Sequence, residues 1–104
     1  MSKQPLCLLD ELEPGTARRF DVDGRAIAVV RLGDDVYALG DTCSHANYSL
    51  SEGEIDADEK TIECWKHGSE FSLETGEALT LPATRPVPRY EVVVDGDEVL
   101  VVVE

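Results

Sequence analysis

Residues 43–45 read Cys-Ser-His and residues 64–67 read Cys-Trp-Lys-His. Each stretch supplies one thiol and one imidazole. Both histidines of the protein and two of its three cysteines occur in these two stretches. Thiolate and neutral imidazole are ligands for zinc, for other borderline metals and for iron–sulfur clusters. The two stretches therefore predict a metal site that is assembled from two loops. Its expected ligands are Cys43, His45, Cys64 and His67.

Around these stretches the chain consists of short β-rich runs separated by turn residues, and helix signals are nearly absent. Asp-Gly pairs at 23–24 and 95–96 lie between such runs, and Asp-Gly is a preferred hairpin turn. Residues 81–88 contain three prolines, which exclude a central strand and predict an extended loop. The pattern predicts an all-β antiparallel sandwich in a single domain, 1–104, with a small insertion at about 41–68 that carries both ligand stretches.

The composition restricts the partners and the location. A formal net charge of −13 argues against nucleic acid or an anionic membrane as partner and favours a positively charged protein surface. No segment approaches the roughly 20 apolar residues of a membrane span, and the first residues lack the apolar stretch of a signal peptide. Three cysteines do not make a disulfide framework. We expect a cytoplasmic monomer, with Cys7 as a small residue of the core.

The distribution of ligand types separates two kinds of metal site. A zinc site of the finger type groups its cysteines at one end and its histidines at the other, commonly with a helix. Here each stretch contributes one of each, which suits a binuclear centre whose two metals take different ligands. In a Rieske [2Fe–2S] cluster, two cysteines bind one iron and two histidines bind the other. A zinc-binding structural or regulatory module is the alternative that the ligands alone leave open.

The sequence resembles the Rieske-type ferredoxins, the soluble electron carriers of bacterial aromatic-ring and related oxygenases. The resemblance covers nearly the whole chain, and the paired Cys/His stretches are its specific part. The flanking features that also match are Pro14-Gly15, Asp23-Gly24, Gly68-Ser69-Glu70-Phe71, Thr75-Gly76 and the proline loop.

The resemblance implies one [2Fe–2S] cluster. Cys43 and Cys64 would bind its inner iron, and His45 and His67 would bind its outer iron with their free ring edges toward solvent. Three further residues would surround the cluster: Ser69 as a hydroxyl bonded to a bridging sulfide, Pro82 in a shielding third loop, and Trp65. For Trp65 the alternatives are packing over the cluster and contact with a partner, and we expect packing.

Departures from the high-potential respiratory branch of the family bear on the reduction potential. That branch has a disulfide between the two loops, where this sequence has Tyr48 and Lys66. It also has a tyrosine whose hydroxyl bonds a ligand sulfur, where this sequence has Phe71. Because hydrogen bonds to sulfur raise the potential, we expect a midpoint toward the lower end of the Rieske range, roughly −150 to +300 mV.

The function implied by the resemblance is one-electron transfer from a flavin-dependent, NAD(P)H-oxidising reductase to a terminal non-haem iron oxygenase. The chain has no dinucleotide fingerprint and no room for a mononuclear iron domain, so no turnover is expected from this protein alone. The sequence leaves open a Rieske protein with another client, such as iron–sulfur assembly or a reductase that uses it as small subunit.

Overall fold

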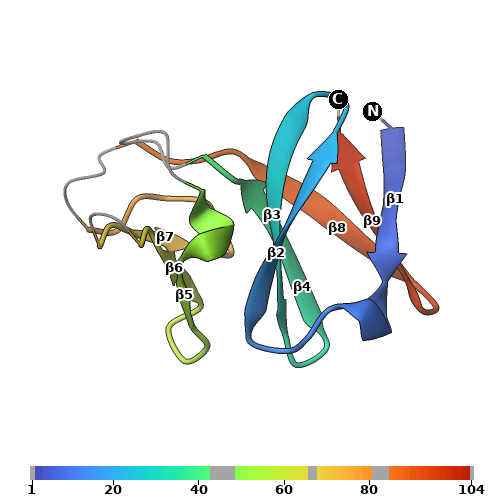
Figure 1. The fold of residues 1–104 in the computed structure, drawn as a ribbon, viewed down its shortest axis with the longest axis horizontal. Helices are drawn as coiled ribbons and strands as arrows, with labels where there is room; N and C mark the ends of the chain where they lie inside the picture. The colour runs from blue at the N-terminus through green and yellow to red at the C-terminus, as the bar shows by residue number, and fades with distance from the viewer. Residues whose placement is uncertain (1, 43–48, 66–67, 81–84, 104) are drawn as a thin grey trace.

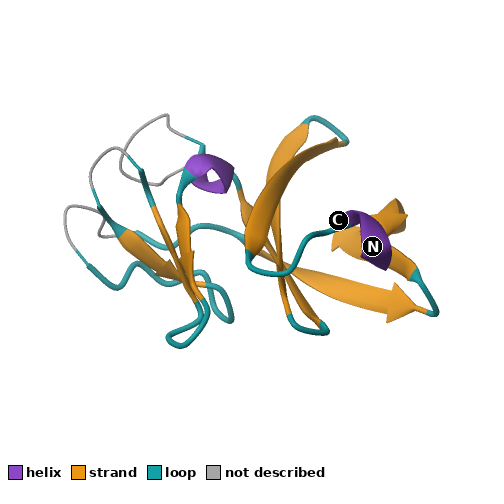
Figure 2. Cartoon of the chain, turned by 60° about the horizontal axis from the view of Figure 1, so that its bottom comes forward, coloured by secondary structure: helices purple, strands orange, loops and turns teal. Residues whose placement is uncertain are grey.

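The computed structural model describes residues 2–42, 49–65, 68–80 and 85–103, which form two antiparallel sheets (Figures 1 and 2). The strands are β1 Ser2–Leu8, β2 Thr16–Val22, β3 Arg25–Leu32, β4 Asp35–Gly40, β5 Glu54–Asp56, β6 Thr61–Glu63, β7 Glu70–Ser72, β8 Arg89–Asp95 and β9 Glu98–Val103. Single 3₁₀ turns cover η1 Leu9–Glu11 and η2 Leu50–Glu52. Neither of these described helices is long enough to cross a membrane.

The large sheet is curled and has the strand order β1-β9-β8-β4-β3-β2, with β1 and β2 as its edge strands (Figure 1). The small sheet has the order β5-β6-β7 and lies at the opposite end of the molecule from β1 and β9. The predicted all-β antiparallel fold is confirmed. β7 ends at Ser72, so the small sheet continues beyond residue 68, where the expected insertion ended.

The two predicted Asp-Gly turns have different outcomes. Asp23 and Gly24 have φ of 50° and 79°, and they form the two-residue loop between β2 and β3 as predicted. In the last hairpin Asp95 pairs with Glu98, so the loop is Gly96-Asp97 and the predicted turn was placed one residue too early. Of these loop residues only Gly96 has positive φ, 62°, because the glycine takes the first central position of the turn.

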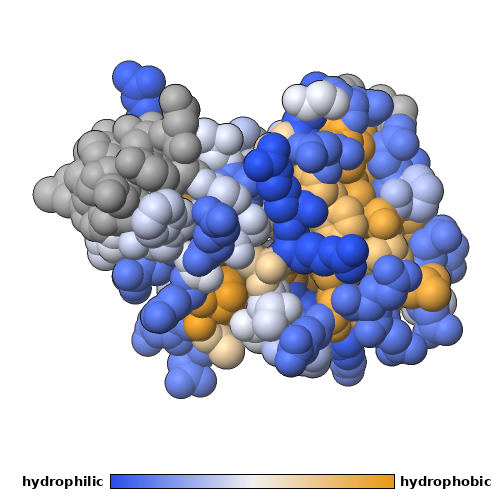
Figure 3. All heavy atoms as spheres, in the orientation of Figure 1, coloured by the Kyte–Doolittle hydropathy of each residue, from blue (hydrophilic) through white to orange (hydrophobic). Residues whose placement is uncertain are grey.

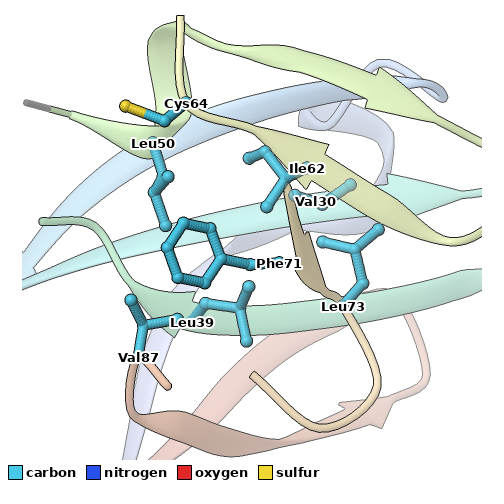
Figure 4. Packing of buried hydrophobic residues seen from close by; sticks show 8 residues of the cluster. All are labelled: Val30, Leu39, Leu50, Ile62, Cys64, Phe71, Leu73 and Val87. Carbon is cyan, nitrogen blue, oxygen red and sulfur yellow. The ribbon is translucent and has the colours of Figure 1, made fainter. Parts of the chain in front are cut away.

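Two apolar clusters stabilise the fold, and β3 contributes to both. Because successive residues of a strand point to opposite faces, Val29 packs in the curl of the large sheet and Val30 packs toward the small sheet. The first cluster consists of Leu12, Val22, Ile27, Val29, Ala38, Val99, Val101 and Val103. The second consists of Val30, Leu39, Leu50, Ile62, Cys64, Phe71, Leu73 and Val87, which Figure 4 shows. The small sheet is therefore fastened to the large one by a continuous apolar contact.

Cys7 lies in β1 and is partly buried beside the first cluster. Burial raises the pKa of its thiol, and the neighbouring Glu11 carboxylate adds to the rise, while Arg18 lowers the pKa. This position agrees with the expected structural role and lies on a strand of the large sheet, away from the small sheet (Figure 1).

Candidate metal centre

Cys64 is the one expected ligand that falls in the described residues; Cys43, His45 and His67 lie outside them, as does Pro82. Cys64 follows β6 directly, has no exposed surface and forms no disulfide. In Figure 4 its sulfur points away from Ile62 and Val30. A thiolate at such a site requires a positive charge beside it, because an isolated buried charge is costly. Ferric iron would supply that charge, so the residue fits a cluster ligand.

The base of the first ligand loop is held together by Asp41, which is almost completely buried. Its carboxylate accepts hydrogen bonds from Ser49 Oγ at 2.5 Å and from the backbone N–H of Ser51 at 2.9 Å. Its backbone carbonyl accepts the N–H of Leu50 at 2.6 Å, and Thr42 forms a bridge with Ser49. The residues that flank positions 43–48 are therefore joined by side-chain and backbone bonds.

The base of the second ligand loop is closed by the backbone. Cys64 N donates to the carbonyl of Ser69 over 2.7 Å, and Gly68 N donates to the carbonyl of Cys64 over 2.9 Å. Ser69 is completely buried, which fits the proposed position next to a cluster. Trp65 has about half of its surface exposed, at 50%, so the expectation that it packs over the cluster stays a prediction.

The described ends of the third loop are anchored to β7 and to the turn that follows it. Thr80 Oγ1 accepts the N–H of Glu70 at 2.8 Å and lies 3.4 Å from the carbonyl of Gly68. At the other end Val87 N donates to the carbonyl of Gly76 over 2.9 Å. Gly76 has φ of +81°, and a Cβ added there would lie 2.4 Å from the Val87 carbonyl oxygen. A glycine is required at this position, since any side chain would push the loop away.

These three loop bases meet at one end of the molecule. Leu50 follows the first loop, Cys64 begins the second and Val87 follows the third, and all three belong to the same apolar cluster (Figure 4). The apolar cluster positions the ends of the three loops, and the hydrogen bonds fix the directions in which the loops leave it. The described residues by themselves contain no group of three or more histidine, cysteine or acidic side chains that could hold a metal ion.

Asp41 was not among the residues predicted for the site, because a single acidic residue in a β-rich chain is ordinarily solvated. A signal was present: Asp41 precedes the Cys-Ser-His stretch, and Ser49 and Ser51 follow it. Such a pattern is compatible with a carboxylate that closes a loop through hydroxyl and N–H donors, as the structure shows.

Comparisons with known proteins agree with this geometry. The family model for the Rieske [2Fe–2S] domain matches residues 2–91. The 3-phenylpropionate/cinnamic acid dioxygenase ferredoxin subunit of Shigella boydii serotype 4 (strain Sb227) is 40% identical over 101 residues, which cover 97% of this chain and 93% of that protein. The solved ferredoxin of carbazole 1,9a-dioxygenase from Nocardioides aromaticivorans IC177 is 45% identical with a TM-score of 0.93, covering 97% of this chain and 99% of that one.

A third similar structure is a chain in the complex of reduced oxygenase and oxidized ferredoxin in carbazole 1,9a-dioxygenase. It is 41% identical with a TM-score of 0.89, covering 95% of this chain and 91% of that one.

The chain belongs to the Rieske [2Fe–2S] family. Within that family it is a ferredoxin of the dioxygenase systems, an electron-carrying component. Membership implies a [2Fe–2S] cluster, in agreement with the expectation from the sequence and against the zinc module. The buried, unpaired Cys64 and the adjoining loop bases fit such a group.

Proposed function

We propose that this chain carries one electron at a time on a [2Fe–2S] cluster whose ligands are Cys43, Cys64, His45 and His67. The bound cluster would supply reversible one-electron chemistry. The chain would hold the cluster, keep water from its cysteine side and leave its histidine side accessible to partners.

One observation supports this ligand set most directly: the described residues bring the bases of both Cys/His loops to one end, next to the buried thiol of Cys64. The two loops are far apart in sequence, so this juxtaposition is a property of the fold. The proline loop ends at the same place, with Val87 buried beside Cys64, and this supports its proposed shielding role.

We propose a flavin-dependent, NAD(P)H-oxidising reductase as electron donor and a terminal non-haem iron oxygenase as acceptor. The complex of oxygenase with a related ferredoxin supports the acceptor. The donor follows from the electron source that such an oxygenase needs, and NAD(P)H chemistry favours a cytoplasmic location. We also propose that the single domain works as a monomer.

Spectroscopy of the purified protein tests the ligand set. We expect a red-brown protein with two irons per chain and the electron paramagnetic resonance signal of a reduced Rieske cluster. Separate His45→Ala and His67→Ala variants should lose that signal, whereas Cys7→Ser should keep it. A colourless protein with one zinc, or a cluster that depends on Cys7, would overturn the assignment.

A further inference from the structure

The side chain of Thr80 joins the second ligand loop to the start of the third loop. Its Oγ1 accepts the backbone N–H of Glu70 over 2.8 Å and lies 3.4 Å from the carbonyl oxygen of Gly68. In the sequence Gly68 directly follows His67, an expected ligand, and Thr80 directly precedes positions 81–84. One hydroxyl therefore contacts the ends of two loops of the candidate metal centre. Its two contacts, with Glu70 N and Gly68 O, are here called the Thr80 clamp.

The hydroxyl acts where the segment before the third loop leaves β7. Leu79 N donates to the Glu70 carbonyl over 2.8 Å, and the N–H of Glu70 then bonds the Thr80 side chain. A hydroxyl has one hydrogen and two lone pairs, so an oxygen that accepts this N–H still has its own hydrogen to donate. The Gly68 carbonyl is the acceptor within its reach. The clamp therefore uses both the accepting and the donating capacity of one group.

Gly68 is held through both of its backbone groups. Its N–H donates to the Cys64 carbonyl over 2.9 Å, and its carbonyl lies toward the Thr80 hydroxyl. Its φ of +74° lies in the left-handed region that glycine adopts without a steric cost. Glycine has no side chain to pack and has wide backbone freedom, so backbone contacts have to fix its conformation. The Thr80 clamp supplies one of these contacts directly after the expected ligand His67.

The two contacts of the clamp differ in strength. The bond from Glu70 has an ordinary length, whereas 3.4 Å is long for a hydroxyl that donates to a carbonyl, whose usual length is about 2.7–2.8 Å. Thr80 is exposed, and the described surface at the small-sheet end of the molecule is mostly hydrophilic (Figure 3). Water therefore replaces part of the clamp when it opens. We expect its loss to affect local opening of the two loops more than global unfolding.

We propose that Thr80 is a positioning residue for the cluster, which holds the second ligand loop against the start of the third loop through its hydroxyl. Contacts that orient a metal ligand from behind commonly affect both the metal affinity and the orientation of that ligand. The clamp would therefore slow the loss of iron and restrict the orientation of His67. The presence of the cluster rests on the proposed function; the clamp itself rests on the two contacts of Thr80.

Iron release tests the clamp in the full-length holoprotein. Thr80→Val removes the hydroxyl and keeps a branched side chain, whereas Thr80→Ser keeps the hydroxyl. Reduced samples of equal initial iron content are mixed with the ferrous chelator bathophenanthroline disulfonate, and the release is followed by absorbance. We expect Thr80→Val to release iron about tenfold faster than the wild type, the lower end of the usual effect because Thr80 is exposed. Thr80→Ser should restore the wild-type rate to within about twofold, and failure of this rescue would overturn the role of the hydroxyl.

Thr16→Val is the matched control. Thr16 is also exposed, and its Oγ1 donates to the Glu13 carbonyl over 2.6 Å, but it lies at the start of β2 in the large sheet. The control therefore loses a hydroxyl-to-backbone bond that touches no ligand loop. Its rate of iron release should stay within about twofold of the wild type, because distant sites act independently. Equal acceleration in Thr16→Val and Thr80→Val would show general destabilisation and would overturn the proposal.

The electron paramagnetic resonance spectrum of the reduced cluster gives a readout that a loss of stability alone does not move. We expect broader lines in Thr80→Val, because a ligand loop without the clamp takes up a wider range of orientations. Thr80→Ser and Thr16→Val should keep the line widths of the wild type. An unchanged spectrum in Thr80→Val would overturn the positioning role, whatever its rate of iron release.

Hydrogen exchange separates the clamp from the cluster. Exchange of the Glu70 amide is followed by mass spectrometry of the segment 68–72, and we expect it to be at least about fivefold faster in Thr80→Val, since the N–H loses its acceptor. Unchanged exchange would overturn the clamp. A wild-type protein that lacks the Rieske signal but shows this difference in exchange would refute the proposed function alone. A normal signal that Thr80→Val leaves unaltered would refute the positioning role alone.

Discussion

Removal of the Asp41 carboxylate should destabilise the protein strongly, because this group closes the first ligand loop. It accepts hydrogen bonds from Ser49 Oγ and Ser51 N and is only 2% exposed. A hydrogen bond to a charged group contributes about 1.5–3 kcal/mol, and donors left without a partner add a penalty. We expect Asp41→Ala to lower the free energy of unfolding by about 3–5 kcal/mol and Asp41→Asn, which keeps one acceptor, by about 1–2 kcal/mol.

The assay is thermal unfolding of the holoprotein followed by circular dichroism at one scan rate, with visible absorbance recorded in parallel. For a domain of this size, each kcal/mol lowers the melting temperature by roughly 4–8 °C. Asp41→Ala should therefore melt at least roughly 10 °C lower than the wild type. The visible absorbance of the Asp41→Ala variant should also be lost before the strands unfold, because the base of the first ligand loop opens first.

Asp21→Ala is the matched control. Arg19 forms an ion pair with Asp41 at 3.8 Å and another with Asp21 at 3.2 Å, but the Asp21 side chain is 68% exposed. A surface ion pair of this kind contributes at most about 1 kcal/mol, so the melting temperature should change little. If Asp41→Ala melts within about 3 °C of the wild type, or no lower than Asp21→Ala, the carboxylate does not hold the loop base and the reasoning is refuted.

Four further predictions concern the core, the third loop, the N-terminal cysteine and the potential. Phe71→Ala should cost about 3–5 kcal/mol in chemical denaturation, because Phe71 is fully buried between the two sheets, and a cost below about 1 kcal/mol would contradict that packing. Gly76→Ala should lower the melting temperature and the iron content together, since the added Cβ meets the Val87 carbonyl at 2.4 Å; an unchanged iron content would separate this contact from the site. Because the pKa of the Cys7 thiol is raised, less thiolate is present at a given pH, so alkylation by iodoacetamide at pH 8.5 should be slower than that of a free cysteine and should accelerate in alkali; a rate equal to that of the free amino acid would be inconsistent with burial. Voltammetry should place the midpoint toward the lower end of the Rieske range of roughly −150 to +300 mV, and a value well above zero would show that a missing tyrosine hydroxyl at Phe71 does not set it.

Local pattern was enough to predict the class of fold and the kind of metal site. The Asp23-Gly24 turn depends on the φ preferences of two adjacent residues, so it can be predicted without the rest of the chain. The expected cluster follows from thiol and imidazole chemistry and from the resemblance that the paired stretches carry. These are properties of residue type and short spacing, and they are therefore present in the sequence as such.

The tertiary structure decided what depends on register and on contacts between distant segments. Taken by itself, Asp41 gives no sign of a special role in the sequence. Its role follows from the fold, which brings Ser49 Oγ and Ser51 N within hydrogen-bond distance of its carboxylate. The turn at 96–97 followed from the pairing of Asp95 with Glu98. A shift of one residue in a strand would exchange its two faces.

The acidic residues of the small sheet show the same dependence most clearly. Glu54, Glu63 and Glu70 are scattered in the sequence and become one charged surface only because β5, β6 and β7 pair in this register. Cross-strand alignment is set by packing of the apolar face, which involves Ile62 and Phe71 against the large sheet. The sequence by itself determined which ligands were available, and the packing decided which residues lie at the loop bases beside them.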